Sequence, residues 1–202
     1  MEAGAYFIRR SRVGIVAVSL GIALVCIVAG AAETGLPISK KEKTIMTMTI
    51  TSSSFPHLGA IPTRHTCEGH DTSPELFWTE IPEGTKSLVL IMDDPDAPDP
   101  AAPKRTWVHW VLYNIPVNTS GLPEAIAARD LPTGTLEGLN DWQRTGYGGP
   151  CPPIGSHRYF HKLYALDTVL PDLNQPTKAK LEQTMQGHVI AHSELIGLYQ
   201  KH

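Results

Sequence analysis

Two proline-rich loops carry most of the side chains that could bind or transform a small molecule. Residues 93–98 read DDPDAP, residues 149–157 read GPCPPIGSH, and the sequence WVHW lies between them at 107–110. Proline restricts the backbone φ angle, so carboxylates and imidazoles on such loops lose little conformational freedom when a ligand binds. The two loops therefore predict a preformed site for a small ligand.

The histidines in and after these loops are the side chains whose surroundings decide the chemistry. His109 lies between two tryptophans, and we expect a carboxylate of the first loop to fix its tautomer and raise its pKa. His157 and Tyr159 share one face of a strand, because alternate residues point to the same side. His161 shares this face, where it either adds a polar group to the pocket or lies at its floor, and we favour the floor.

Four aspartates of the first loop lie at positions 93, 94, 96 and 99. A calcium loop of the EF-hand type needs a glycine turn and a terminal glutamate, and prolines replace these features here. We therefore predict no metal and no cofactor. Instead, we expect Asp94 and Asp96 to orient His109 and to contact the ligand.

The same side chains leave more than one function open. Aspartate, histidine and tyrosine can act as general acids and bases, so a hydrolase that uses the Asp and His side chains is one interpretation. The sequence has no nucleophile elbow, no glycine-rich phosphate loop and no motif with metal-ligand spacing. We therefore predict a non-enzymatic protein that binds a small anionic ligand. A protein inhibitor of a protease or kinase is the second interpretation.

The segments that must position these side chains read mainly as strands, because they show alternating or continuous apolar residues. The predicted strands are 46–50, 87–92, 108–113, 159–166 and 189–199. Strict alternation places His109, Val111 and Tyr113 on one face of the third strand.

One short helix is predicted over 177–186, between Pro176 and Gly187. Many strands separated by proline and glycine turns, with little helix, indicate a mostly β protein with the architecture of a β-sandwich.

Residues 1–32 have the features of a secretory signal. Arginines at 9, 10 and 12 precede an uncharged apolar run over 13–32 that ends in small residues. This run is also long enough to span a bilayer as an uncleaved anchor, although we favour cleavage. Residues 33–45 then form a tether and 46–202 the domain. We expect export to the periplasm or the extracellular space, with membrane contact only if 13–32 stays uncleaved.

The charge of the chain limits the classes of partner, and its cysteine content predicts a disulfide. Without residues 1–32, 14 basic and 19 acidic side chains remain, a formal charge of −5, and no basic stripe with interleaved aromatics predicts a nucleic acid partner. Cys67 and Cys151 are the cysteines that follow the leader. An even pair in an oxidising compartment favours a disulfide over two unpaired thiols.

Several of these motifs, in this order, resemble the phosphatidylethanolamine-binding protein family, and more closely its bacterial and archaeal branch described as Raf kinase inhibitor-like. The resemblance covers about residues 46–202. Its motifs are TSPELFW at 72–78, DPDAP at 94–98, WVHW at 107–110, GPCPP at 149–153, HRY at 157–159 and LYALD at 163–167.

The resemblance implies a large sheet packed against a smaller one, short peripheral helices and a pocket at one end. It implies a small-anion site, for a phosphate-containing head group or a similar ligand, formed by Asp94, Asp96, Pro98, Trp107, His109, Gly149, Pro150, Cys151, Pro152, His157 and Tyr159. It also implies a cis Ala97–Pro98 bond and leaves open a cis Arg105–Thr106 bond. Family members usually carry an aromatic residue at the position of His161.

Overall fold

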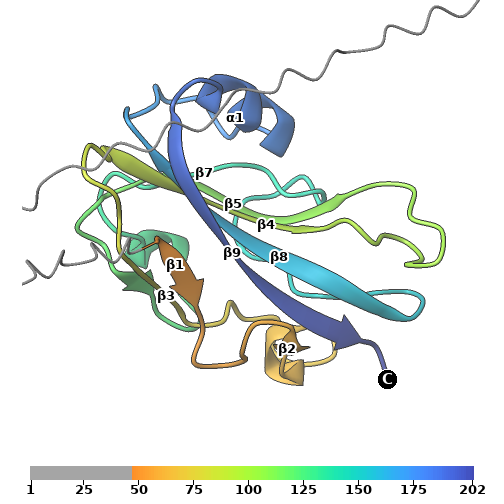
Figure 1. Cartoon of the computed structure of the whole chain (residues 1–202). Helices are drawn as coiled ribbons and strands as arrows, with labels where there is room; N and C mark the ends of the chain where they lie inside the picture. Colours follow the sequence, from red (N-terminus) through yellow and green to blue (C-terminus); the bar gives the residue numbers. More distant parts are fainter. Residues whose placement is uncertain (1–46) are drawn as a thin grey trace, which may run out of the picture. The chain divides into compact units, whose positions relative to one another are not determined.

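Two β-sheets form the domain that the computed structural model describes, which comprises residues 47–202 (Figure 1). The predicted leader, anchor and tether lie outside these residues. The six-stranded sheet has the order β2-β9-β8-β4-β5-β7, in which only β2 and β9 pair in parallel. Its strands are β2 (Gly59–Ala60), β4 (Ser87–Asp94), β5 (Trp107–Ile115), β7 (Leu136–Glu137), β8 (Ser156–Leu166) and β9 (Val189–Gln200).

The smaller sheet has three strands in the antiparallel order β1-β3-β6. These are β1 (Thr49–Thr51), β3 (Leu76–Thr79) and β6 (Gly121–Leu122). Two 3-10 helices, Thr63–His65 and Ala128–Asp130, lie in the connections, and one α-helix, α1 (Lys178–Met185), precedes β9. The mostly β fold with two sheets and a short helix near the C-terminus is therefore confirmed.

Strand β4 is buried along its whole length because both faces of the large sheet are covered. Its residues Leu88, Leu90 and Met92 pack toward the small sheet, in a core that includes Ile50 and Trp78. The opposite face of the sheet packs on helix α1 through Val89, Ile91, Leu181 and Met185. A strand covered on both sides needs apolar residues on both faces, which explains the continuous apolar run over 87–92.

Helix α1 is held by a cap and by an ion cluster. The Thr177 hydroxyl accepts a hydrogen bond from the backbone N–H of Lys180 at 3.3 Å. The fully buried carboxylate of Asp93 lies 2.6 Å from Lys178 Nζ of the helix and 2.9 Å from Lys162 Nζ of β8. Asp93 of the first loop motif is therefore a structural group that ties the helix to the sheet.

A β-bulge in β5 overturns the predicted alternation around His109. Met92 pairs with Trp110 and Asp93 pairs with Val108, so His109 is an extra residue opposite the junction. Val108 consequently packs with Val111 on the helix side, whereas Trp110 packs between the sheets. His109 does not share a face with Val111 in the way strict alternation predicts.

The structure also bears on the expected cis peptide bonds and on membrane-spanning helices. Ala97–Pro98 is cis as expected, and the Arg105–Thr106 bond, which the resemblance left open, is not cis. No helix within residues 47–202 is long and apolar enough to cross a membrane.

Candidate functional site

A cavity of about 440 Å³ opens where the two proline-rich loops meet β5 and β8. The first loop supplies one wall, the second loop supplies another, and the strands supply the floor. The residues that line it are Asp94, Ala97, Pro98, Lys104, Arg105, Trp107, His109, Trp142, Cys151, Pro152, Pro153, His157 and Tyr159. Within residues 47–202 no cluster of His, Cys, Asp or Glu has the grouping of a metal site.

Most of the predicted site residues line this cavity, and three do not. Asp96, Gly149 and Pro150 lie behind the lining. The sequence analysis missed Ala97, Lys104, Arg105, Trp142 and Pro153. Arg105 and Lys104 directly precede the strand that carries Trp107, which is a signal that could have been used, whereas Trp142 reaches the cavity only through tertiary packing.

Asp96 holds the first loop against β8. Its carboxylate accepts three hydrogen bonds from Arg158, from the backbone N–H at 2.9 Å, from Nε at 2.9 Å and from Nη2 at 2.7 Å. These bonds lower the pKa of Asp96. With its oxygens directed at Arg158, Asp96 positions the loop rather than contacting the cavity.

Asp94 pairs with His157, not with His109 as we expected. Asp94 Oδ2 lies 2.7 Å from His157 Nδ1, and its Oδ1 accepts the backbone N–H of Asp96 at 2.8 Å. His157 Nε2 lies 3.0 Å from the carbonyl oxygen of Ile154. Both ring nitrogens of His157 therefore lie against oxygens of the protein and are engaged within the domain.

His109 presents the opposite arrangement. Its Nδ1 lies 2.7 Å from the carbonyl oxygen of Gly148, so this nitrogen carries the proton and donates it. Burial lowers the pKa of His109, contrary to the increase we expected, because the charged ring would lose its hydration. Nε2 makes no hydrogen bond with any residue of 47–202 and carries a lone pair at the cavity.

Two hydrogen-bond donors that belong to lining residues are themselves buried and lack acceptors within the described domain. They are the hydroxyl of Tyr159, whose side chain is fully buried, and Nε1 of Trp107. Burial raises the pKa of Tyr159, with a further contribution from Asp94, so the phenol keeps its proton. The ring of Tyr159 meets that of His109 edge-on, with 5.2 Å between centroids.

Two cations and two tryptophans form the rim. The Arg105 guanidinium lies 4.4 Å from the centroid of the Trp107 ring and 3.0 Å from Asp141 Oδ2. Trp142 packs edge-on against Trp107, with 5.3 Å between centroids. Lys104 is exposed and makes no ion pair within 47–202.

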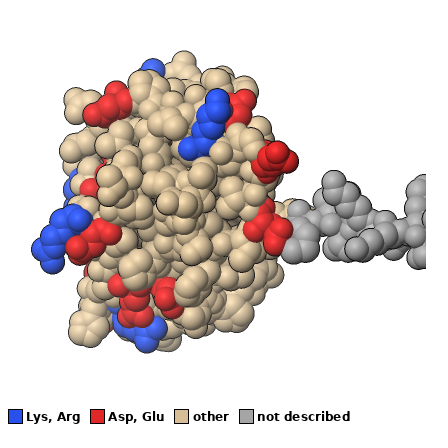
Figure 2. Space-filling view, turned by 90° about the vertical axis from the view of Figure 1, so that its left-hand side faces the viewer, with Lys and Arg blue, Asp and Glu red and all other residues tan. Residues whose placement is uncertain are grey.

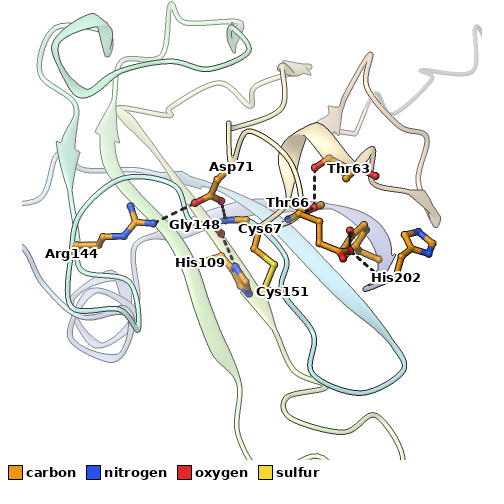
Figure 3. The surroundings of a disulfide bond; sticks show 12 residues. Thr63, Thr66, Cys67, Asp71, His109, Arg144, Gly148, Cys151 and His202 are labelled. Carbon is orange, nitrogen blue, oxygen red and sulfur yellow. Dashed lines mark hydrogen bonds and ion pairs between the residues drawn. A yellow bond between two sulfur atoms is a disulfide. The ribbon is translucent and has the colours of Figure 1, made fainter.

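The predicted disulfide joins Cys67 to Cys151, with a Cα–Cα distance of 5.4 Å (Figure 3). The linked loops also pair through the backbone: Gly149 N–H donates to Asp71 Oδ1 at 2.6 Å, and Cys67 N–H donates to the Pro150 carbonyl at 3.1 Å. A Cβ atom at Gly149 would lie 2.4 Å from the carbonyl oxygen of His65, so only glycine fits there. The bonds of Gly149 and Pro150 therefore hold the loop that forms this cavity wall, although neither residue lines the cavity.

His161 lies in the core and does not line the cavity. Its ring packs 5.7 Å from the Phe55 ring, and neither ring nitrogen has a hydrogen-bond partner among the described residues. Burial lowers the pKa of His161 to about 4. The ring is neutral and fills the space that an aromatic side chain would fill.

Comparison with known proteins gives the chain its relatives. The family model of the phosphatidylethanolamine-binding proteins matches residues 51–200. The UPF0098 protein of Methanothermobacter thermautotrophicus is 46% identical over 155 residues, which cover 76% of this chain and 99% of that protein. The UPF0098 protein of Aquifex aeolicus is 45% identical over 157 residues, covering 76% of this chain and 89% of that protein.

Solved structures agree with the sequence comparison. The phosphatidylethanolamine-binding protein homologue CT736 of Chlamydia trachomatis superposes with a TM-score of 0.71 at 40% identity, covering 77% of this chain and 99% of that one. The E. coli protein YbcL, described as a member of the mammalian family, gives a TM-score of 0.70 at 34% identity, covering 78% and 100%. This chain belongs to the phosphatidylethanolamine-binding protein family.

Proposed function

We propose that the chain is a non-enzymatic protein that binds a small anionic ligand, such as a phosphate-containing head group, in the cavity between its two proline-rich loops. The observation that carries this proposal is a pair of buried donors on lining residues, the Tyr159 hydroxyl and the Trp107 indole N–H, which have no acceptor within residues 47–202. A buried donor left unsatisfied costs about 1–3 kcal/mol, and a ligand oxygen that reached it would recover this cost. Lys104 and Arg105 at the rim add positive charge at the entrance.

The lining favours binding over covalent catalysis. Cys151 is already in a disulfide, and no serine or threonine of the described domain lines the cavity. Both ring nitrogens of His157 lie against oxygens, of Asp94 and of Ile154, so neither nitrogen is free to act on a ligand. A rigid cavity with fixed donors is the arrangement of a preorganised binding site.

Nucleic acid is not part of this proposal. On the face of the molecule in Figure 2, basic and acidic side chains are interspersed and the centre is uncharged. The whole chain carries a formal charge of −3. Neither feature supplies the basic surface that binding to a phosphate backbone requires.

Isothermal titration calorimetry of the full chain with methyl phosphate tests the proposal. Tyr159→Phe removes only the hydroxyl, and we expect about a tenfold loss of affinity because one hydrogen bond to the anion is lost. Tyr164→Phe is the matched control: Tyr164 lies on the same strand, stacks on His192 and does not line the cavity. This control should bind like the wild type.

Two outcomes would count against the proposal. Unchanged affinity in a folded Tyr159→Phe variant would remove its main support. Release of inorganic phosphate from methyl phosphate by the wild type, abolished in His109→Ala, would favour the hydrolase interpretation.

A further inference from the structure

The disulfide lies where a small molecule can reach it. Cys151 lines the cavity, and Cys67 lies outside the lining, in the loop that follows the 3-10 helix Thr63–His65. Both cysteines are exposed. Exposed disulfides are the labile ones, because a thiolate can approach their sulfur atoms. This bridge is therefore open to attack while the domain remains folded.

The loops that the bridge joins are also held together by backbone bonds. Gly149 N–H donates to Asp71 Oδ1 at 2.6 Å, and Cys67 N–H donates to the Pro150 carbonyl at 3.1 Å. These bonds lie on both sides of Cys151 and do not involve sulfur. Cleavage of the bridge therefore leaves the two sulfur atoms near each other, so that the bond can form again without refolding of the domain.

The charges of the cavity favour an attacking group that is negative. A thiolate, not a thiol, is the nucleophile in disulfide exchange. The lining contains two cations, Lys104 and Arg105, and one carboxylate, Asp94. Arg105 is paired with Asp141 at 3.0 Å, whereas Lys104 is exposed and makes no ion pair within 47–202. Lys104 therefore attracts an anion to the cavity that Cys151 lines.

We propose that the Cys67–Cys151 bridge is an exchange site at which a small anionic thiol, such as one that carries a carboxylate, forms a mixed disulfide with Cys151. The thiolate sulfur bonds to Sγ of Cys151, and the bond between the two Sγ atoms breaks. Its electron pair stays on Cys67, which leaves as a thiolate and takes a proton from water. The incoming sulfur is oxidised and the Cys67 sulfur is reduced, so no other reactant is needed.

The reverse step releases the thiol. Sγ of Cys67 attacks Sγ of Cys151 and expels the small thiolate, which restores the bridge. Of the two cysteines, Cys151 is the one in the lining, so we assign it as the sulfur that holds the thiol. This activity goes beyond the proposed function, because neither Tyr159 nor Trp107 takes part in it.

Peptide mapping of the full chain tests the site of attack. The folded, oxidised protein is incubated with 3-mercaptopropionate, and free thiols are then blocked with iodoacetamide. Mass spectrometry should find mercaptopropionate on Cys151 and the carbamidomethyl group on Cys67, and the map separates both from Cys26 of the leader. Circular dichroism during the reaction should show that the domain stays folded.

A cysteine variant traps the mixed disulfide. In Cys67→Ser the adduct cannot be resolved by residue 67, so mercaptopropionate should accumulate on Cys151 when the variant is treated with 3,3′-dithiodipropionate. Cys151→Ser is the matched control, and its Cys67 should react more slowly because it lies outside the lining. The map of the wild type needs no substitution, so it identifies the attacked sulfur even where a variant is unstable.

A lysine variant tests the route through the cavity. Lys104→Ala should slow opening of the bridge by 3-mercaptopropionate about threefold and speed opening by the cationic thiol cysteamine by a similar factor, as expected for one charge about 6 Å away in water. Comparing each thiol with itself removes differences in intrinsic reactivity. Lys86→Ala, an exposed lysine outside the lining, should change neither rate.

Three results would overturn the proposal. The first is a bridge that resists 3-mercaptopropionate until urea unfolds the domain. The second is a map that places mercaptopropionate on Cys67. The third is a Lys104→Ala variant that reacts with both thiols at the wild-type rates, which would mean that attack does not pass through the cavity.

Discussion

His157 and His109 line one cavity, yet they differ in how many of their ring nitrogens are bonded within the protein. Both nitrogens of His157 lie against oxygens of the protein, whereas His109 has one nitrogen against a carbonyl and the other at the cavity. The His157 ring holds the two loops together, whereas the His109 ring keeps one nitrogen that a ligand can contact. Which histidine pairs with Asp94 could not be read from the sequence, because both come from strands next to the same loop.

Asp96→Asn should lower stability more than it lowers ligand affinity. Arg158 depresses the pKa of Asp96, so this interaction stabilises the fold above the unfolded pKa of about 4 and is lost as pH falls through the lower folded value. Because Arg158 is half exposed, we expect only about 1 kcal/mol at pH 7. Urea unfolding at pH 7 and pH 3 checks this, since the difference between variant and wild type should shrink at pH 3.

The buried ring of His161 makes a second prediction about pH. Its folded pKa of about 4 lies below the unfolded value near 6.5, so stability is full above pH 6.5 and falls as the pH drops toward 4. The loss is at most about 3 kcal/mol. His161→Phe should flatten this part of the stability curve and raise stability at pH 5. A variant that keeps the wild-type slope would show that other groups cause it.

Strands β5 and β8 carry the polar floor of the site, and the bulge in β5 gives His109 its place. Periodicity predicted these strands well, because a half-buried strand must alternate and a fully buried one must be apolar. It could not predict the bulge, since one inserted residue changes the register without changing the composition of the segment. The four-residue strand β3 and the two-residue strands β2, β6 and β7 were missed for a related reason: their pairing depends on neighbours brought near by the fold.

The disulfide joins two loops that also have other bonds. Replacing both Cys67 and Cys151 by alanine should destabilise the domain by about 4.5 kcal/mol in the chain-entropy model, because 84 residues separate the cysteines. The contacts of Gly149 with Asp71 and of Tyr147 with His65 remain, so the cavity wall should stay in place. Thermal unfolding should show a clear loss of stability while calorimetry shows less than a tenfold loss of affinity. Abolished binding in the folded variant would mean that the bridge alone shapes the wall.

At the scale of the whole molecule, the motif-bearing part of the sequence and the described domain coincide. The fold class and most of the cavity lining followed from the motifs and the resemblance they carry, and the pairing of the cysteines followed from their even number after the leader. The rim was not predicted. Trp142 belongs to neither loop motif, and it contacts Trp107 and His109 only in the folded domain. Sequence motifs thus located the floor of the site better than its entrance.

We expect the mature protein to be exported and to start near Ala32 or Glu33. A disulfide is consistent with an oxidising compartment, and residues 1–32 have the pattern of a signal. Intact-mass spectrometry of protein purified from its own host should give this N-terminus and a mass two hydrogens below that of the dithiol. A product that begins at Met46 or Met48 with two thiols would contradict export.

The division of the cavity between strands and loops has a consequence for how its specificity could diverge. The groups proposed to hold the oxyanion come from β5 and β8, where a substitution also disturbs the core. Lys104, Arg105 and Trp142 come from loops, which accept changes in length and sequence more readily. Related chains could therefore bind the same anionic group through the strands, while their loops change to contact different substituents on that group. A library randomised only at 99–105 and 141–146 should yield folded variants with altered ligand preference that still require the phosphate group.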